Sequence, residues 1–453
     1  MKKKVALNLT TTHIIMLSFL LVIFAGSILL ALPVSSATGE AVPYLDALFM
    51  ATTATCVTGL VTLPTVTTWS IFGQIVILIL IQIGGLGVIT IITGFTVSLH
   101  KRIGIGDSML LQDAFNLNTL SGLREFVKKV ILGTFLVEGV GALGYMLVFV
   151  PEYGLKGIWI SVFNAISAFC NAGIDIISKN SLCEYVHNPI INIVSCVLII
   201  VSGIGYIVWW DMLRVLKNFK KQKMKCFRQL TLHSKIAISV TGILIITGAV
   251  LVFLFEYNNP LTMKDFTLFQ KIQASIFQSV TTRTAGFATI PQQNLTNATA
   301  IVSLLLMFIG GSPVGTAGGV KTVTMAILVM AAFAAIKNKN EVEMFQRTIS
   351  KQAVSKAVAV VCMSFIIMFV STVLLSAVTQ ADALDIFYET VSATATVGLT
   401  RNLTPSLNLW GKVIIIITMY LGRVGPISLA TAFNARKESP NLIKNPTEKI
   451  SVG

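Results

Sequence analysis

The chain has 453 residues, of which 54% are hydrophobic and 12% charged, and its mean hydropathy is +0.82. A soluble domain carries about twice this charged fraction, so the composition excludes an ordinary soluble protein and predicts a polytopic membrane protein. The formal net charge is +15, but the basic residues are spread over many connections, which argues against nucleic-acid binding.

Eight mostly apolar windows of about 19 or more residues predict membrane-spanning helices. They lie near 14–32, 71–97, 130–150, 190–210, 236–256, 297–336, 353–378 and 408–433. An even number of spans puts both termini on one side, and the connections on that side hold 26 of the 34 Lys and Arg residues. The positive-inside rule therefore predicts a multi-pass protein of the cell membrane, with cytoplasmic N- and C-termini in contact with anionic lipid. The first window follows a basic start, as in a signal peptide, but we expect it to be retained as a span.

Each connection on the opposite side contains a short amphipathic stretch and then a small-residue turn that ends in glycine. The turns end at Gly59, Gly173, Gly286 and Gly398, with spacings of 114, 113 and 112 residues. A fixed period of this kind indicates repeated units. The short stretches hold about 11 residues, too few to cross a bilayer, so they must enter the membrane and return.

The sequence therefore predicts an all-α polytopic membrane protein with eight transmembrane helices plus four re-entrant pore helices. Each repeat has a first span (M1), a pore helix and a second span (M2), and the four M1–pore–M2 repeats surround one pore. We expect the repeats to cover 1–99, 100–215, 216–340 and 341–453, the last with a short cytoplasmic tail.

The glycine turns predict a cation filter. Backbone at membrane depth without helical hydrogen bonds is tolerated where it lines a water-filled path, and rings of carbonyl groups replace the hydration shell of K+. Glycine reaches the backbone angles that such a ring needs, and the short helices direct the negative ends of their dipoles at the cavity. The predicted filter residues are Val57, Thr58, Gly59, Asn171, Ala172, Gly173, Thr284, Ala285, Gly286, Thr396, Val397 and Gly398.

The sixth window is interrupted by FIGGSPVGTAGGVKT, residues 308–322. Its end imitates a phosphate-binding loop, but that motif needs glycine directly before the lysine and a preceding strand. A glycine-rich break below the filter must line the ion path, so we predict a gate at 310–319, with a static packing kink as the alternative. The predicted gate residues are Gly310, Gly311, Ser312, Pro313, Gly315, Thr316, Gly318 and Gly319, together with Arg423.

Several charged residues fall inside or beside the apolar windows. A lone arginine such as Arg423 is costly there, and two roles are open for it. It bonds carbonyls of 310–316 and holds the gate closed, or it forms a positive barrier to cations. Arg283 lies three residues before the third filter glycine, and we expect it to brace the filter from behind against carbonyls or acids. Glu389 is expected to brace the filter in the same way.

Other acids and bases have plainer interpretations. Asp46 and Asp385 each lie 13 residues before a filter glycine, and helix N-capping is favoured over attraction of cations at the mouth. For Glu138, within a span, we expect a buried hydrogen-bonded acid. The segment 214–235 holds eight basic residues, and contact with anionic lipid is favoured over contact with a regulatory subunit.

Three segments carry a family resemblance: residues 277–287 (FQSVTTRTAGF), 308–322 and 422–426 (GRVGP). With them, the chain from about 17 to 434 resembles the Ktr/Trk/HKT superfamily of potassium transporters, and within it the KtrB-like membrane subunit of bacterial Ktr systems. The resemblance implies potassium selectivity where all four filter positions are glycine, as they are here, and an intramembrane gate at 310–319. It also implies a homodimer, with the C-terminal tail at its interface, and a cytoplasmic nucleotide-binding regulatory subunit of RCK type.

The favoured function is a potassium uptake pore, passive or sodium-assisted, driven by the membrane potential. An alternating-access secondary cation symporter is the alternative, although such proteins usually carry an intramembrane acid for coupling. An enzyme is not expected, because the four histidines do not cluster and no His-Glu-x-x-His or Gly-x-Ser-x-Gly motif occurs. We expect no covalently bound cofactor; K+ is the substrate, and Na+ is a candidate coupling or activating ion.

Overall fold

The computed structural model describes residues 11–88, 90–91, 93, 123–217, 226–339 and 341–425. Parts of several predictions lie outside these residues: the ends of two predicted spans (94–97 and 426–433), the middle of the basic segment (218–225), and both termini. Regular structure in the described part is helical except for one short antiparallel hairpin of β1 (Val342–Met344) and β2 (Arg347–Ile349).

The helices follow one order four times along the chain: a long helix, a shorter helix, and then one or two further apolar helices. The first unit has α1 (Thr11–Ala31), α2 (Tyr44–Cys56), the one-turn α3 (Thr65–Thr68) and α4 (Ile71–Leu86). The second has α7 (Leu123–Tyr153), α8 (Leu155–Cys170), α9 (Pro189–Ile204) and α10 (Tyr206–Lys217). The third has α12 (Cys226–Gln229), α13 (Leu232–Glu256), α14 (Leu268–Thr281), α15 (Asn297–Phe308) and α16 (Thr322–Ile336). The fourth has α17 (Lys351–Val378), α18 (Ala383–Thr394) and α19 (Leu409–Val424).

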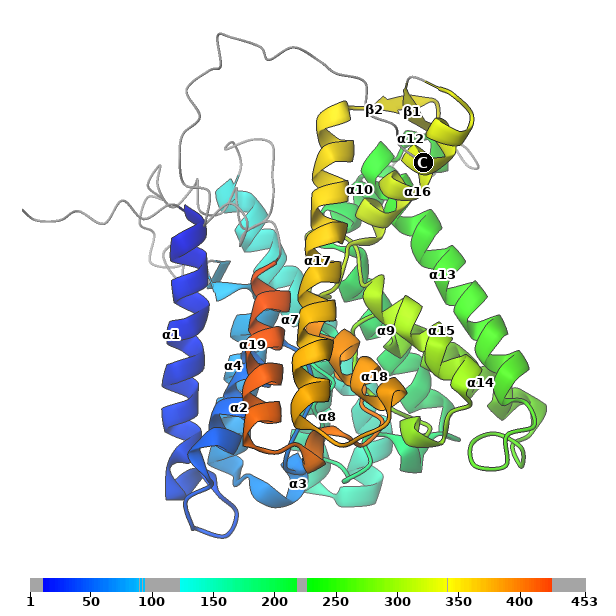
Figure 1. The fold of residues 1–453 in the computed structure, drawn as a ribbon. Helices are drawn as coiled ribbons and strands as arrows, with labels where there is room; N and C mark the ends of the chain where they lie inside the picture. Colours follow the sequence, from blue (N-terminus) through cyan, green and yellow to red (C-terminus); the bar gives the residue numbers. More distant parts are fainter. Residues whose placement is uncertain are drawn as a thin grey trace, which may run out of the picture.

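Four helices of the described part are long and apolar enough to cross a membrane, namely α1, α7, α13 and α17. The bent pair of α9 and α10 makes a fifth if it is counted as one span. In Figure 1 the long helices α1, α13 and α17 run along the height of the molecule, and the hairpin β1–β2 lies at one end beside α10 and α12. The protein is therefore a multi-pass helical membrane protein, whereas the count of eight spans with four re-entrant helices stays a prediction.

The surface is apolar and the centre is polar. Large side chains of the long helices are exposed, such as Leu21 (69%), Leu147 (68%) and Ile246 (66%), as expected of a surface that faces hydrocarbon. The short helices are buried along most of their length, and their buried residues include hydroxyl side chains such as Thr52 and Thr53 of α2. Polar groups in membrane proteins face the bundle interior or a water-filled cavity, so the centre of the four units is the place to look for an ion path.

The second apolar helices of three units end at a glycine with a left-handed backbone. These glycines are Gly87 (φ 85°), Gly205 (φ 97°) and Gly425 (φ 91°). At Gly205 the chain bends by 97° between α9 and α10. The apolar window near 190–210 therefore contains a helix break, in the second unit as well as in the third, because glycine there adopts angles that a helix does not contain.

Two other glycines allow these helices to pack directly on the ends of the short helices. A Cβ atom at Gly84 of α4 would lie 2.0 Å from the carbonyl oxygen of Thr55 in α2. A Cβ atom at Gly422 of α19 would lie 2.2 Å from the carbonyl oxygen of Thr394 in α18. The same contact in the first and fourth units fixes how far each short helix reaches toward the centre.

Replacement of Gly84 by Ala is expected to lower the midpoint of thermal unfolding in detergent by several degrees. The added Cβ collides with a backbone carbonyl, and overpacking of this kind costs about 1–3 kcal/mol. Gly242→Ala in α13 is the matched control, because its Cβ would meet nothing within 4 Å. Equal midpoints for the two variants would contradict this account of the packing.

Candidate ion pathway

The four glycine turns meet in a closed ring. A Cβ atom at Gly398 would lie 2.9 Å from Cα of Gly59, and one at Gly286 would lie 3.3 Å from Cα of Gly398. A Cβ atom at Gly173 would lie 2.6 Å from Cα of Gly286, and one at Gly59 would lie 2.5 Å from the carbonyl oxygen of Ala172. Each glycine thus touches its neighbours from the adjoining units, and residues more than 100 positions apart in the sequence surround one axis.

The backbone repeats the same conformation in all four turns. The residue two positions before each glycine is left-handed, with φ of 56° at Val57, 60° at Asn171, 69° at Thr284 and 50° at Thr396. The glycines also have positive φ, from 63° to 102°. The carbonyl oxygens of Thr58, Ala172, Ala285 and Val397 are the atoms nearest to the Cβ positions of the neighbouring glycines. The predicted filter residues are thus brought together, with one carbonyl oxygen from each turn directed at the ring.

Hydroxyl side chains of the short helices hold these turns in place. Thr53 Oγ1 accepts the N–H of Gly59 at 2.9 Å, and Ser392 Oγ accepts the N–H of Gly398 at 3.0 Å. Ser167 Oγ donates to the carbonyl of Ile174 at 2.6 Å, and Thr281 Oγ1 donates to that of Phe287 at 2.6 Å. These residues are not among the predicted ones, although a Ser or Thr recurs five or six positions before each filter glycine.

Both predicted supports contact the backbone or side chains around the filter. Glu389 is fully buried in α18 and accepts hydrogen bonds from the hydroxyl groups of Thr400 (2.6 Å) and Thr404, both in the segment that follows the fourth turn. Arg283 donates from Nη2 to the carbonyl of Gly310 at 3.3 Å. Arg283 therefore joins the third turn to the first residue of the 310–319 loop, while Glu389 braces the fourth turn from outside the ring.

Asp46 and Asp385 do not cap their helices, so that prediction is wrong. The N-cap residues of α2 and α18 are Pro43 and Asp382, and neither makes a side-chain capping bond. Asp46 instead pairs with Nζ of Lys412 at 2.5 Å, and Asp385 pairs with Nε of Arg401 at 2.6 Å. Both carboxylates lie two residues inside the first turn, where a nearby cation is a better partner than the helix N–H groups.

Glu138 lies where the second unit packs on the first. Gln82 of α4 donates from Nε2 to Glu138 at 3.3 Å, and the thiol of Cys170 lies 3.9 Å from the other carboxylate oxygen. The acid is buried (4% exposed), and the expected hydrogen-bonded interior role is confirmed. The cluster joins α4, α7 and the end of α8 behind the filter.

The loop 310–319 is fastened to the second unit at its start and its middle. The N–H of Ser312 donates to the carbonyl of Gly203 at 2.8 Å, and the N–H of Tyr206 donates to the carbonyl of Val314 at 2.9 Å. A Cβ atom at Gly205 would lie 2.4 Å from the carbonyl oxygen of Pro313. This part of the loop therefore packs against the bend between α9 and α10.

The second half of the loop lies against the filter. Asn171 donates from Nδ2 to the hydroxyl of Thr316 at 2.7 Å, and the N–H of Gly318 donates to the hydroxyl of Thr284 at 3.1 Å. A Cβ atom at Gly318 would lie 1.9 Å from Oγ1 of Thr396. The loop thus contacts the left-handed filter residue of three units, and only glycine fits at position 318.

Arg423 joins the loop to the first unit. Its guanidinium donates from Nη1 to the carbonyl of Thr316 at 2.9 Å and from Nη2 to the carbonyl of Gly84 at 2.5 Å. Lys321 similarly donates from Nζ to the carbonyl of Ala317 at 2.5 Å. The expected contact of Arg423 with carbonyls of 310–316 is confirmed, and the same residue also holds the C-terminal end of α4.

A cavity of about 240 Å³ borders the ring of four filter glycines, on the side opposite the loop 310–319. All four filter glycines line it, together with residues of the segments that follow each turn, such as Ile174 and Leu399. The four glycine turns therefore lie between an open cavity on one side and the loop 310–319 on the other.

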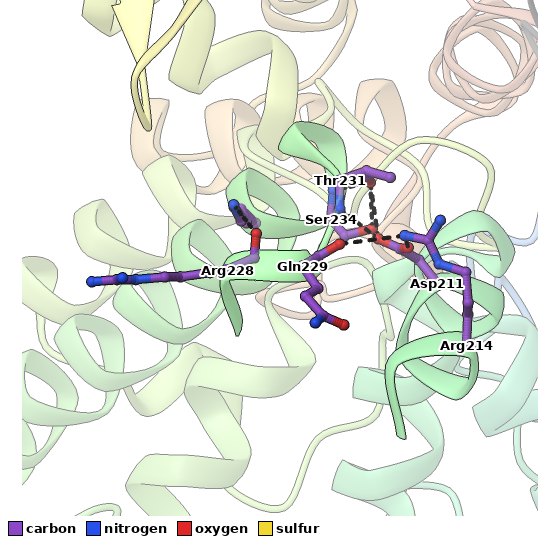
Figure 2. A network of polar contacts seen from close by, with 7 residues as sticks. Asp211, Arg214, Arg228, Gln229, Thr231 and Ser234 are labelled. Atoms are coloured by element: carbon purple, nitrogen blue, oxygen red, sulfur yellow. Dashed lines mark hydrogen bonds and ion pairs between the residues drawn. The ribbon is translucent and has the colours of Figure 1, made fainter. Parts of the chain in front are cut away.

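A polar network joins α10 to α12 and the start of α13 (Figure 2). Asp211 accepts hydrogen bonds from the N–H and hydroxyl of Thr231 (2.8 and 2.9 Å) and pairs with Arg214 at 2.5 Å. Lys235 donates from Nζ to the carbonyl of Arg228 at 2.9 Å. Asp211 thus holds α10 against Thr231, the N-cap of α13, while Lys235 joins α13 to α12.

Comparison with known proteins agrees with this geometry. The sequence model of the TrkH family, described as a cation transport protein, matches residues 2–445. The chain is 38% identical over 460 residues to the potassium/sodium uptake protein NtpJ of Enterococcus hirae, covering 100% of this chain and 99% of that protein. It is 39% identical over 445 residues to the Ktr system potassium uptake protein B of Bacillus subtilis, and the match covers 98% of this chain and 97% of that protein.

Among solved structures, the crystal structure of the potassium transporter TrkH from Vibrio parahaemolyticus matches with a TM-score of 0.74, over 95% of this chain and 86% of that chain. The identity is 16%, so the match shows a shared fold. Fold and site together define a cation transport protein of the membrane, not an enzyme. The chain belongs to the TrkH/Ktr family, as the sequence resemblance predicted.

The ion pair of Asp46 and Lys412 is expected to couple the first and fourth units. Asp46→Asn and Lys412→Met are each expected to lower the midpoint of thermal unfolding, and the double variant to lower it no further than either single one. Coupling between contacting residues is typically about 0.5–3 kcal/mol, and both side chains here are largely buried. Asp382→Asn, an exposed acid at the start of α18, is the control. Additive losses in the double variant would show that the pair is not coupled.

Proposed function

We propose that this chain is the ion-translocating subunit of a Ktr-type potassium uptake system. The single observation that carries the proposal is the ring in which four glycine turns present one carbonyl oxygen each, with an open vestibule on one side and a fastened loop on the other. The names of the relatives, a potassium/sodium uptake protein and a Ktr system potassium uptake protein, support K+ as the substrate.

Potassium is selected by the backbone carbonyls of the filter turns. Such carbonyls replace the hydration shell of the ion, and their positions are fixed by the hydroxyl groups behind each turn. All four ring positions are glycine, so no side chain narrows the path or offers a competing ligand. The C-terminal ends of α2, α8, α14 and α18 precede the turns, and their dipoles favour a cation at the centre.

Flux is gated by the loop 310–319 together with Arg423. The loop covers the filter on the side opposite the vestibule, and Arg423 fastens it to α4 through two carbonyl groups. A guanidinium so close to the ion path also repels cations, so the two roles of Arg423 act in the same direction. Release of these bonds lets the glycine-rich loop swing aside, while the helices that flank it stay in place.

The membrane arrangement has eight spans and four re-entrant pore helices in four M1–pore–M2 repeats. Both termini lie in the cytoplasm, since the basic connections are on that side. The chain forms a homodimer and is controlled by a cytoplasmic nucleotide-binding subunit of RCK type. The name of one relative, a Ktr system protein, supports a multi-component assembly, and that of another, a potassium/sodium uptake protein, supports Na+ as a candidate second ion.

The filter is tested by potassium uptake in cells that lack their own potassium systems, with and without an RCK-type partner. The wild-type chain is expected to restore growth at limiting potassium. Gly59→Ser is expected to lower the preference for K+ over Na+ about tenfold, which corresponds to ~1.4 kcal/mol. The reason is that its Cβ would lie 2.5 Å from the carbonyl oxygen of Ala172 at a φ of 102°.

Gly242→Ser, at a glycine with open space around it, is the control for insertion and amount in the membrane. Absence of potassium uptake by the wild type even with the partner present would contradict the proposed function. Unchanged selectivity of Gly59→Ser would contradict the filter assignment.

The gate is tested by Arg423→Ala and Arg423→Lys. Loss of the side chain removes the bonds to Thr316 and Gly84 together with the positive charge, so potassium flux through Arg423→Ala is expected to rise about three- to tenfold. Lys keeps the charge but cannot form the forked bonds. If the flux of Arg423→Lys is raised as in Arg423→Ala, the bonds to Thr316 and Gly84 restrict the flux. If the flux of Arg423→Lys equals that of the wild type, the positive charge restricts it. Unchanged flux in Arg423→Ala at equal membrane amount would contradict both roles.

A further inference from the structure

The vestibule in front of the filter contains one acid among its lining residues. Asp175 lies two residues after Gly173 and lines the same cavity of about 240 Å³ as the four filter glycines. The residue is partly exposed, and it lies beside the space that an ion crosses before it reaches the ring. Asp175 makes none of the hydroxyl–backbone bonds that hold the four filter turns.

The carboxylate is held in a fixed position. Asp175 Oδ1 accepts the N–H groups of Ile177 at 3.1 Å and Ser178 at 3.4 Å. The hydroxyl of Ser181 further stabilises the charged form. A charge fixed beside the ring acts on every ion that enters, whereas a mobile surface acid would be screened by water and salt.

The other charges around Asp175 come from its own loop. Lys179 lines the same cavity, and Glu184 and the thiol of Cys183 lie nearby on the short 3-10 turn. The lining residues from the other three units are uncharged, for example Thr65, Gln293 and Asn402. The local field in the vestibule is therefore set mainly by the opposed charges of Asp175 and Lys179.

We propose that Asp175 is a cation-attracting residue of the outer mouth, which concentrates K+ in front of the filter and thereby sets the external concentration for half-maximal uptake. The inference rests on the proposed function of the chain as a potassium pathway. A fixed charge in a cleft with low-dielectric walls raises the local concentration of its counter-ions, and Asp175 acts in this way against the opposing charge of Lys179 in the same cavity.

The same residue makes uptake sensitive to external pH. Burial raises the pKa of Asp175 to about 6, although the N–H groups of Ile177 and Ser178 and the hydroxyl of Ser181 act in the opposite direction. Above this pH the carboxylate is charged and attracts cations. As the external pH falls through about 6, the charge and its attraction are lost, so the half-maximal potassium concentration rises.

Potassium uptake by the full chain with its partner, measured against external potassium at pH 7.5 and 5.5, tests the inference. Asp175→Asn removes the charge but keeps a side-chain oxygen that accepts the same two N–H groups. It is expected to raise the half-maximal concentration about threefold at pH 7.5, to leave the maximal rate nearly unchanged, and to abolish the pH dependence. Asp175→Glu is expected to retain most of the wild-type affinity. Asp265→Asn, an exposed acid of the α13–α14 connection, is the matched control.

A wild-type half-maximal concentration and pH profile in Asp175→Asn would overturn the inference, as would a loss confined to the maximal rate. Lys179→Gln provides an independent readout if Asp175→Asn does not reach the membrane. It is expected to lower the half-maximal concentration, and an unchanged value would overturn the inference. Normal potassium uptake by the wild type with no effect at position 175 contradicts this inference alone, whereas absence of uptake by the wild type contradicts the proposed function as well.

Discussion

The structure depends on backbone carbonyl groups that leave a helix inside a membrane. Hydrocarbon offers these groups no hydrogen-bond partner, so they must face protein, water or an ion. The four turns at Gly59, Gly173, Gly286 and Gly398 meet this constraint by converging on one axis, where each presents a carbonyl to the same space. A single turn of this kind would leave its carbonyl groups unpaired at high cost, whereas four in a ring present the set of carbonyl oxygens that the proposed cation site requires.

The contacts around the ring follow from this constraint. The left-handed residue two positions before each glycine is strained. Hydroxyl groups of the short helices hold each turn by bonding the glycine N–H or the carbonyl of the residue after the glycine. Glycines in α4 and α19 bring their helices against the last turns of α2 and α18. On the opposite side of the ring from the vestibule, backbone groups of the loop 310–319 bond partners from the second, third and fourth units. Movement of that loop therefore has to exchange hydrogen bonds with the end of α9 and with Arg423, which also bonds the carbonyl of Gly84 in α4.

The sequence located the repeated turns and one contact between units, but it did not predict the ion pair between the first and fourth units or the hydroxyl groups behind the turns. The glycine period located the four turns, and Arg423 was expected to reach the carbonyls of the loop because its place in the last apolar window matches that of the loop in the third unit. Asp46 was read as a helix cap, because its partner Lys412 lies 366 residues away and no local pattern connects them. The hydroxyl group of Ser392 and its equivalents were within reach of sequence reasoning, since they recur at nearly fixed spacing before each turn.

The central claim is that the four carbonyls at Thr58, Ala172, Ala285 and Val397 bind the permeating ion, and it is tested most directly by anomalous X-ray scattering from crystals of the protein grown in rubidium. Rubidium has nearly the size of potassium and occupies the same carbonyl sites. We predict anomalous density on the axis of the ring, within coordination distance of all four units, and its loss or displacement in Gly59→Ser. Well-ordered rubidium bound elsewhere in the protein, with none on the axis of the ring, would contradict the account.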